Sequence, residues 1–492
     1  MIRIALILLA VLLTGCDSKP AAKPVPDHPS ASELVAMLDA GETSSVAIVT
    51  ELLRRAQAAS HLNAFITLDA DGALERAAEL DAMRADGKLL GALHGVPLVV
   101  KDNTHVAGLA NTAGTPGLAD FVPESDAPTV AALRVAGAII LGKSNLHELA
   151  FGITSDNATH GAVGNPFDPA LFAGGSSGGT ASAVSAGLAP AGLGTDTGGS
   201  VRIPAALTGI VGFRPSTDRY DSSGVTPISH TRDTVGIISR NVDDAILIDS
   251  VLKPGETVTA KPEADIRLGI ARDYYFANID EATSVIVDES LARLTAAGVT
   301  LVEVEPGDVA GLVAASGFPI AIYEVVTDLS AYLETFNTGK SFDEVGAATA
   351  SPDVNAVFAG LVSGEARVPE EVYQAGLAAR EEMRQMFRRY FADNDLDGMI
   401  FPTTPLPARP IDGSLQSVEL NGEQVPTFPT YIRNTDPASI AGLPGISLPA
   451  GVTRAGLPVG IEIDGPEGSD LDLLAVAAAV ENILSYDARP AD

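Results

Sequence analysis

Cysteine, tryptophan and basic residues are scarce in this 492-residue sequence. It has one cysteine, Cys16, and no tryptophan, and its 31 Lys and Arg residues face 63 Asp and Glu residues, giving a net charge of −32. The single cysteine excludes a disulfide framework within the chain. The acidic balance argues against nucleic acid as a partner, because a negative surface repels phosphate backbones. The seven histidines are scattered without metal-ligand spacing, so we expect no bound metal.

Long apolar runs are absent beyond residue 20, so nothing there predicts a membrane span, which takes about 20 consecutive apolar residues. At the start, Arg3 precedes an unbroken apolar run at residues 4–13, and the adjoining LTGC resembles a bacterial lipobox. We predict a lipoprotein signal peptide at residues 1–15 and lipidation of Cys16. The lipid would anchor an exported protein on the periplasmic side of a bacterial membrane. The alternative is a plain signal peptide with a stray cysteine.

Residues 16–29 are rich in Pro and Ala and lack apolar periodicity, which predicts an extended tether between the lipid and the body. The chain length alone is typical of about three domains. Large α/β enzymes exceed that domain length, and the sequence shows no internal repeat.

Short apolar segments alternate with amphipathic ones through the body, which is typical of an α/β layered fold. Two helices are expected within residues 30–59, and further helices at residues 70–85, 127–136, 181–187, 285–297, 321–335, 369–391 and 471–484. Strands are expected at residues 63–67, 95–102, 138–141, 266–271, 398–401, 445–449 and 459–463, with more strands and turns across 209–248. The least readable region is 305–368, where the spacing of apolar residues is irregular.

Two serines framed by glycines stand out in the stretch from residue 172 to residue 204. Ser176 lies in GGSSGG and Ser200 in DTGGSVR, on either side of an Ala-rich segment. Glycine tolerates positive φ and lets a backbone N–H point into a site. The two loops are therefore consistent with a nucleophile and its oxyanion donors held close together. The alternative is a pair of ordinary turns with N-capping serines.

A third candidate is Lys101, which directly follows the apolar LVV of a predicted buried strand. Burial disfavours the ammonium form and lowers the pKa of a lysine, so a neutral amine can act as a base. The alternative is a side chain that extends from the strand end to solvent.

Together, these loops resemble those of the amidase signature family of serine hydrolases, and the resemblance covers roughly residues 31–485. The matching segments are GVPLVVKDN, LGKSNLHELAFG, NP, GGSSGGTASAVSAGL, GLGTDTGGSVRIPAALTGIVGFRPS, SHTRDTVGIISRNVDD, FPTTP, AGLPGISLPAG and LPVGIEIDGP. Residues 93–240 look most like the aryl-acetamide members, the mandelamide and indoleacetamide hydrolases. The resemblance implies an α/β/α layered amidase signature fold, in which helices flank a large mixed β-sheet, with residues 30–492 as its catalytic domain.

The resemblance also implies a Ser-Ser-Lys triad that hydrolyses a small carboxylic amide to a carboxylate and ammonia. The family's lysine falls on Lys101, its bridging serine on Ser176 and its nucleophile on Ser200. The backbone N–H groups that would bind the oxyanion fall on Thr197, Gly198 and Gly199. A serine hydroxyl needs a base to become a nucleophile. Neutral Lys101 would therefore accept a proton from Ser176, which accepts one from Ser200, and an acyl-enzyme would form on Ser200 without a cofactor.

Three further residues are expected to support this machinery. Ser177 would hydrogen-bond within its loop. Asp196 and Arg202 flank Ser200, and we favour a salt bridge between them that fixes the loop. In some relatives the corresponding arginine instead grips a substrate carboxylate.

Other functions fit the sequence less well. GGSSG matches the G-x-S-x-G nucleophile elbow of α/β-hydrolases, which needs an acid and then a histidine after the serine. Only His230 follows Ser176, and it comes too soon. No phosphate-binding G-x-x-x-x-G-K-[ST] motif occurs. Export and acidity argue against an amidotransferase-type amidase subunit, and the complete triad argues against a non-catalytic binding lipoprotein. Esterase activity stays open, since it shares the acyl-enzyme.

The acyl pocket is expected to be lined from residues 305–368 and 403–434. Phe318, Tyr323 and Tyr431 lie there and are consistent with an aryl or aliphatic amide, although core packing explains them equally well. The sequence leaves open the acyl group, a homodimer and the membrane that carries the anchor.

Overall fold

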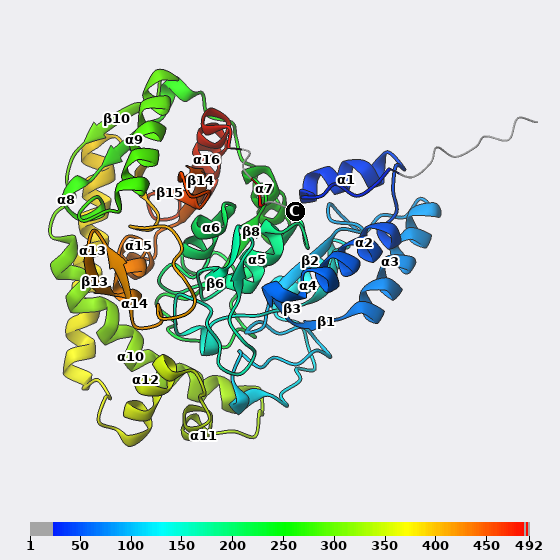
Figure 1. Ribbon diagram of the computed structural model, residues 1–492, viewed down its shortest axis with the longest axis horizontal. Helices are drawn as coiled ribbons and strands as arrows, with labels where there is room; N and C mark the ends of the chain where they lie inside the picture. Colours follow the sequence, from blue (N-terminus) through cyan, green and yellow to red (C-terminus); the bar gives the residue numbers. More distant parts are fainter. Residues whose placement is uncertain (1–22, 487–488, 491–492) are drawn as a thin grey trace, which may run out of the picture.

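A computed structural model describes residues 23–486 and 489–490 (Figure 1). The described strands form one large sheet of eleven, in the order β1 (Phe65–Leu68), β3 (Ile139–Ser144), β2 (Pro97–Lys101), β6 (Ala191–Asp196), β8 (Thr234–Ser239), β7 (Val211–Arg214), β14 (Gly445–Val452), β15 (Pro458–Asp464), β11 (Gly398–Pro402), β9 (Arg267–Ile270) and β10 (Thr300–Glu303). Two small two-stranded sheets pair β4 (Gly164–Asn165) with β5 (Asp168–Phe172), and β12 (Ser417–Leu420) with β13 (Glu423–Pro426).

The large sheet is mixed. β2 lies parallel to both β3 and β6, and β9 lies parallel to both β10 and β11. Between these two parallel groups, β6, β8, β7, β14, β15 and β11 pair antiparallel with their neighbours. All five residues of β2 are buried, which is typical of a central strand covered on both faces.

Helices flank this sheet, as Figure 1 shows. The α-helices are α1 (Ala31–Asp39), α2 (Ser45–Ala58), α3 (Ala70–Ala85), α4 (Pro128–Val135), α5 (Gly178–Ser185), α6 (Arg202–Thr208), α7 (Val242–Leu252), α8 (Arg272–Tyr275), α9 (Glu281–Ala296), α10 (Val309–Thr335), α11 (Phe342–Ala347), α12 (Pro352–Ser363), α13 (Glu370–Asn394), α14 (Thr427–Ile432), α15 (Asp436–Ala441) and α16 (Asp470–Leu484). Short 3₁₀ helices lie at Ser60–Leu62, Pro116–Leu118, Glu148–Ala150 and Glu263–Asp265. The expected mixed sheet with flanking helices is confirmed.

Side-chain caps explain where the first helices begin. The Ser30 and Ser44 hydroxyls accept hydrogen bonds from backbone N–H groups of α1 and α2 at 3.0 and 3.1 Å, and Asp69 caps α3 in the same way at 3.2 Å. Such caps satisfy N–H groups that have no partner within the helix. The predicted pair of helices within residues 30–59 and the helix at residues 70–85 are confirmed.

The predicted signal peptide, Cys16 and the first part of the predicted tether lie outside the described residues. The remainder of that tether, residues 23–29, does not extend away from the body. The Arg55 guanidinium donates hydrogen bonds to the carbonyls of Val25, Pro26 and Asp27 at 2.7–2.9 Å, and Val25 is buried. The prediction of an extended tether at residues 16–29 is therefore wrong for residues 23–29, because hydrogen bonds from Arg55 hold them against α2.

The helix α10 differs most from expectation. It begins at Val309 rather than near residue 321, and it packs along α13 and α15. By length and composition it is the one described helix that could also cross a bilayer. Its buried Glu324 accepts hydrogen bonds from Tyr373 of α13 at 2.8 Å and from Ser229 at 2.5 Å. These contacts pack α10 against the folded body.

Candidate active site

Lys101 is the last residue of β2, and its side chain is completely buried. Its Nζ donates hydrogen bonds to Ser176 Oγ and to Thr195 Oγ1, each at 2.8 Å. A lysine extended to solvent, the alternative weighed above, is therefore wrong. Burial lowers the pKa of Lys101 to about 7, although the charges of Asp196 and Asp233 raise it. A substantial neutral fraction at neutral pH makes Lys101 competent as a base.

Thr195 is a contact that the sequence reasoning missed. It lies in β6 beside β2, and its hydroxyl accepts hydrogen bonds from both Lys101 and Asn103. The sequence signal for this contact is that Lys101 and Thr195 both lie near the carboxyl ends of apolar strand segments. The carboxyl ends of parallel neighbouring strands lie at the same edge of a sheet. Val100 of β2 pairs with Leu193 of β6, and this register brings Thr195 close to the end of β2.

Ser176 and Ser177 lie in the turn that leads into α5. The Gly175–Ser176 peptide bond is cis, and the Ser176 carbonyl accepts a hydrogen bond from the His147 N–H at 3.1 Å. The Ser177 N–H donates to the Ser200 carbonyl at 3.1 Å, and the Ser177 hydroxyl donates to the Thr195 carbonyl at 3.2 Å. Ser177 thus joins the two serine loops and β6.

Ser200 lies between β6 and α6, and 8% of its surface is exposed. It lines a cavity of about 600 Å³. No hydrogen bond joins its hydroxyl to Ser176 or to any other described residue. Gly199, just before it, has φ of 135°, and an added Cβ there would lie 2.1 Å from Thr435 Oγ1. Only glycine fits this approach, which fixes the backbone that presents Ser200.

The three residues expected to bind the oxyanion differ in their backbone hydrogen bonds. The Gly199 N–H already donates to Asp196 Oδ1 at 2.9 Å. Thr197 and Gly198 line the cavity, and their N–H groups have no hydrogen-bond partner among the described residues. The Thr197 hydroxyl donates to Asp233 at 2.5 Å, and the Gly198 carbonyl accepts from Thr435 at 2.5 Å. Two of the three expected donors are therefore free to bind a ligand.

Asp196 and Arg202 form a buried ion pair beneath the Ser200 loop. Arg202 donates to both Asp196 oxygens at 3.0 and 3.1 Å and to Glu462 at 2.5 Å. Arg214 donates to the Asp196 carboxylate at 3.0 Å. Burial raises the pKa of Asp196, but the charges of Arg202 and Arg214 outweigh it and hold that pKa well below its usual range. Because its guanidinium is fully buried and paired, Arg202 is not placed to grip a substrate carboxylate.

The cavity beside Ser200 has mainly apolar walls. Its lining residues come from α8, α10, α14, α15, the loop around Ser200 and other segments: Ala150, Phe151, Gly152, Ile153, Thr197, Gly198, Ser200, Ile228, Arg232, Tyr274, Ala310, Val313, Ala314, Gly317, Phe318, Ala321, Ile322, Phe428, Pro429, Ile432, Arg433 and Asp436. Phe318 packs edge to face against Phe428, with ring centroids 6.0 Å apart.

Of the three aromatic residues expected in this pocket, only Phe318 lines it. Tyr323 stacks on Tyr373 with ring centroids 4.0 Å apart, away from the cavity. Tyr431 is fully buried, packs against Phe172 and donates to the Pro407 carbonyl at 2.7 Å. The expectation for Tyr323 and Tyr431 was wrong, because successive positions on a helix face different directions.

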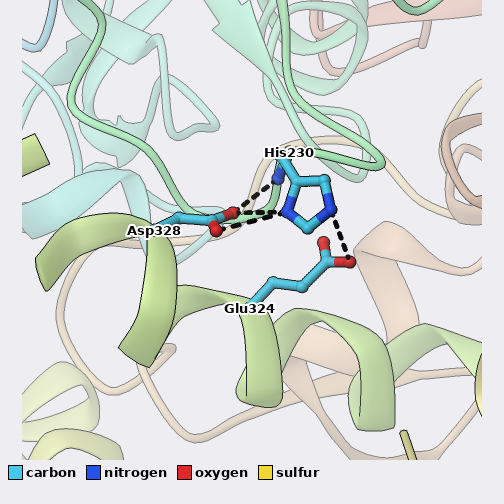
Figure 2. A group of neighbouring side chains, drawn as sticks. All are labelled: His230, Glu324 and Asp328. Carbon is cyan, nitrogen blue, oxygen red and sulfur yellow. Dashed lines mark hydrogen bonds and ion pairs between the residues drawn. The ribbon is translucent and has the colours of Figure 1, made fainter. Parts of the chain in front are cut away.

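A separate group of metal-ligating side chains joins His230 to Glu324 and Asp328 of α10 (Figure 2). Asp328 lies 3.0 Å from His230 Nδ1, whereas Glu324 lies 3.5 Å from Nε2. Burial lowers the pKa of His230, but the two carboxylates outweigh it and raise that pKa. Since the carboxylates face opposite nitrogens of the ring, they suit a doubly paired imidazolium better than three ligands converging on one ion.

The family that this geometry indicates is shown by comparison with known proteins. The Amidase family profile matches residues 47–474. The chain is 42% identical to a mandelamide hydrolase of Pseudomonas putida over 93% of this chain and 92% of that protein. It is 40% identical to an indoleacetamide hydrolase of Agrobacterium vitis, over 91% of this chain and 95% of that protein.

Solved structures agree with these sequence comparisons. The peptide amidase of Stenotrophomonas maltophilia superposes with a TM-score of 0.82 at 29% identity, covering 94% of this chain and 98% of that one. The fold and the site thus define a hydrolase of the amidase signature class. The chain belongs to the Amidase family and is an enzyme that hydrolyses amide C–N bonds.

Proposed function

We propose that the enzyme cleaves a small carboxylic amide to a carboxylate and ammonia through Lys101, Ser176 and Ser200. The observation that carries this proposal is the 2.8 Å hydrogen bond between Lys101 Nζ and Ser176 Oγ, buried beside the cavity that Ser200 lines. In its charged form, the amine donates this hydrogen bond. In its neutral form it accepts the Ser176 proton instead, because its lone pair then points along the same line.

In the proposed reaction, Ser176 passes its proton to Lys101 and takes the proton of Ser200. Ser200 attacks the amide carbonyl, and the N–H groups of Thr197 and Gly198 bind the oxyanion. Loss of one such donor costs about 2.7–4 kcal/mol in other hydrolases. The relay then returns a proton to the leaving nitrogen, so that ammonia rather than an amide anion departs. Water cleaves the acyl-enzyme by the reverse transfers.

The substrate class is proposed from the cavity and from the relatives. The relatives named above are a mandelamide hydrolase and indoleacetamide hydrolases. The apolar walls, with Phe318 and Phe428 packed together, are suited to an aromatic ring. Primary amides of arylacetic acids are therefore the proposed substrates.

We further propose that the enzyme is exported and anchored on the periplasmic side of a bacterial membrane through lipid on Cys16. The lipobox-like LTGC motif supports this. Replacing Cys16→Ala should move the protein from the membrane fraction to the soluble fraction and abolish labelling by a palmitate analogue. Labelling that persists in this variant would contradict the anchor.

The catalytic proposal is tested by ammonia release from phenylacetamide and by labelling with a serine-directed fluorophosphonate. Both should be lost in Ser200→Ala. Both should persist in the matched control Ser330→Ala, because Ser330 is exposed on α10. Labelling of the Ser200→Ala variant, or turnover by it, would overturn the assignment of Ser200 as nucleophile.

A further inference from the structure

The cavity beside Ser200 contains a guanidinium that no carboxylate neutralises. Arg433 directly follows α14 and lines this cavity. Among the described residues, its side chain makes one hydrogen bond, from Nε to Asn434 Oδ1 at 3.0 Å, and no ion pair. Its Nη2 is buried without a partner. Such a group is costly to bury unless something pairs with it.

The other charged groups of the cavity are already paired. Arg232 forms an ion pair with Asp436, and it donates to the carbonyls of Thr197 at 3.1 Å and Gly317 at 2.8 Å. Two arginines and one aspartate therefore leave one positive charge in the cavity. The positive charge in the cavity is opposite in sign to the net charge of −32 on the whole chain. It is therefore a property of this cavity and not of the overall composition.

The surroundings of Arg433 hold its backbone, and its terminal nitrogens make no hydrogen bond to any described residue. The Tyr274 hydroxyl donates to the Arg433 carbonyl at 3.2 Å. Burial lowers the pKa of Arg433, although Tyr274 raises it. A guanidinium still stays charged in a protein, and its planar fork matches a carboxylate through two parallel hydrogen bonds.

We propose that Arg433 is a specificity-determining residue that binds a carboxylate on the acyl portion of the substrate. The inference rests on the proposed function, which places the scissile amide at Ser200 in the same cavity. The apolar residues that line the same cavity, including Val313, Ile322 and Phe428, would contact the body of the acyl group. The favoured substrates are then amides whose apolar or aromatic acyl group ends in a carboxylate.

Two isosteric substrates test this inference: 4-carboxyphenylacetamide and the uncharged 4-isopropylphenylacetamide. We expect at least a tenfold higher kcat/KM for the carboxylate in the unaltered enzyme. Arg433→Gln should lower the ratio of the two kcat/KM values by about tenfold to a hundredfold, the range for charge-assisted hydrogen bonds. Turnover of the isopropyl compound should change much less than turnover of the carboxylate, and its persistence shows that the variant folds.

The matched control is Arg388→Gln, which removes the same charge from the surface of α13, where Arg388 pairs with Glu467. This control should keep the ratio of the unaltered enzyme. The inference is overturned if the unaltered enzyme does not favour the carboxylate, or if Arg433→Gln keeps the same ratio while both compounds are hydrolysed.

If neither compound is hydrolysed, the proposed function fails, and calorimetric binding of 4-carboxyphenylacetamide to Ser200→Ala decides the inference separately. Binding that is lost in Ser200→Ala/Arg433→Gln supports the role of Arg433. No binding, or equal binding with and without Arg433, overturns it.

Discussion

The serine loops and the wall of the cavity are built in opposite ways. Ser176, Ser200 and Lys101 lie in short loops and at a strand end, and hydrogen bonds between polar groups hold them. The wall is instead a long apolar helix, α10, together with the short α14. In the proposed mechanism, the loops position the reacting groups, whereas the wall determines which acyl groups fit the cavity. Changes in the two regions should therefore have separable effects.

The largest effect is expected from Lys101→Ala. Without the base, the kcat for phenylacetamide should fall by about a hundredfold to ten-thousandfold, the usual contribution of general base catalysis. KM should change little, because Lys101 is buried and does not line the cavity. Steady-state ammonia release measures both constants. A higher KM with an unchanged kcat would indicate that Lys101 contributes to substrate binding and not to the chemical step.

The next effect concerns the support beneath the serine loops. Arg202→Met removes the partner of Asp196 and Glu462 inside the protein and should lower the free energy of unfolding by about 3–5 kcal/mol. The exposed Arg54, paired with Glu51, provides a control: Arg54→Met should leave the free energy of unfolding nearly unchanged, because water screens an exposed ion pair. Urea denaturation measures both changes. Equal losses would show that the buried network does not stabilise the loop.

The smallest effect is expected in the wall. Phe318→Ala should raise KM for phenylacetamide by a few-fold and leave acetamide turnover unchanged, because it removes one exposed aromatic contact. Tyr323→Ala, which changes the same helix on a face away from the cavity, should leave both within about twofold. Michaelis–Menten kinetics of the two variants, each with phenylacetamide and with acetamide, provides the comparison. Selectivity that responds to Tyr323 and not to Phe318 would contradict the assigned wall.

The sequence predicted the loops well for a physical reason. Glycines around Ser176 and Ser200 are needed where other atoms approach the backbone closely, as the Thr435 side chain does at Gly199, and such needs are visible in the residue types themselves. Most strands and the helix at residues 70–85 were likewise visible from their apolar patterns. The sequence did not reveal the contact of Thr195 with Lys101, nor the hydrogen bond from the Gly199 N–H to Asp196. Both depend on how separate strands and loops meet in the fold.

The two segments expected to line the pocket, residues 305–368 and 403–434, do supply much of its wall. The individual lining residues could not be predicted, because α10 is apolar on nearly every side. One face packs along α13 and α15. Another lines the cavity at helical spacing, through Ala310, Val313, Ala314, Gly317, Phe318, Ala321 and Ile322. Two apolar faces on one helix remove the contrast that a periodicity search needs. The charge of Arg433 was also uninformative in sequence, since only the fold shows that its partner is missing.

The central claim is that neutral Lys101 draws a proton through Ser176 to activate Ser200. The most direct test is the rate of fluorophosphonate labelling of Ser200 across pH, in the unaltered enzyme and in Lys101→Ala. Because the pKa of Lys101 is about 7, the unaltered rate should fall about tenfold per pH unit below 7 and level off above it. The variant should be slow, with no inflection near pH 7. An inflection near pH 7 that persists without Lys101, or a variant that labels as fast as the unaltered enzyme, would contradict the claim.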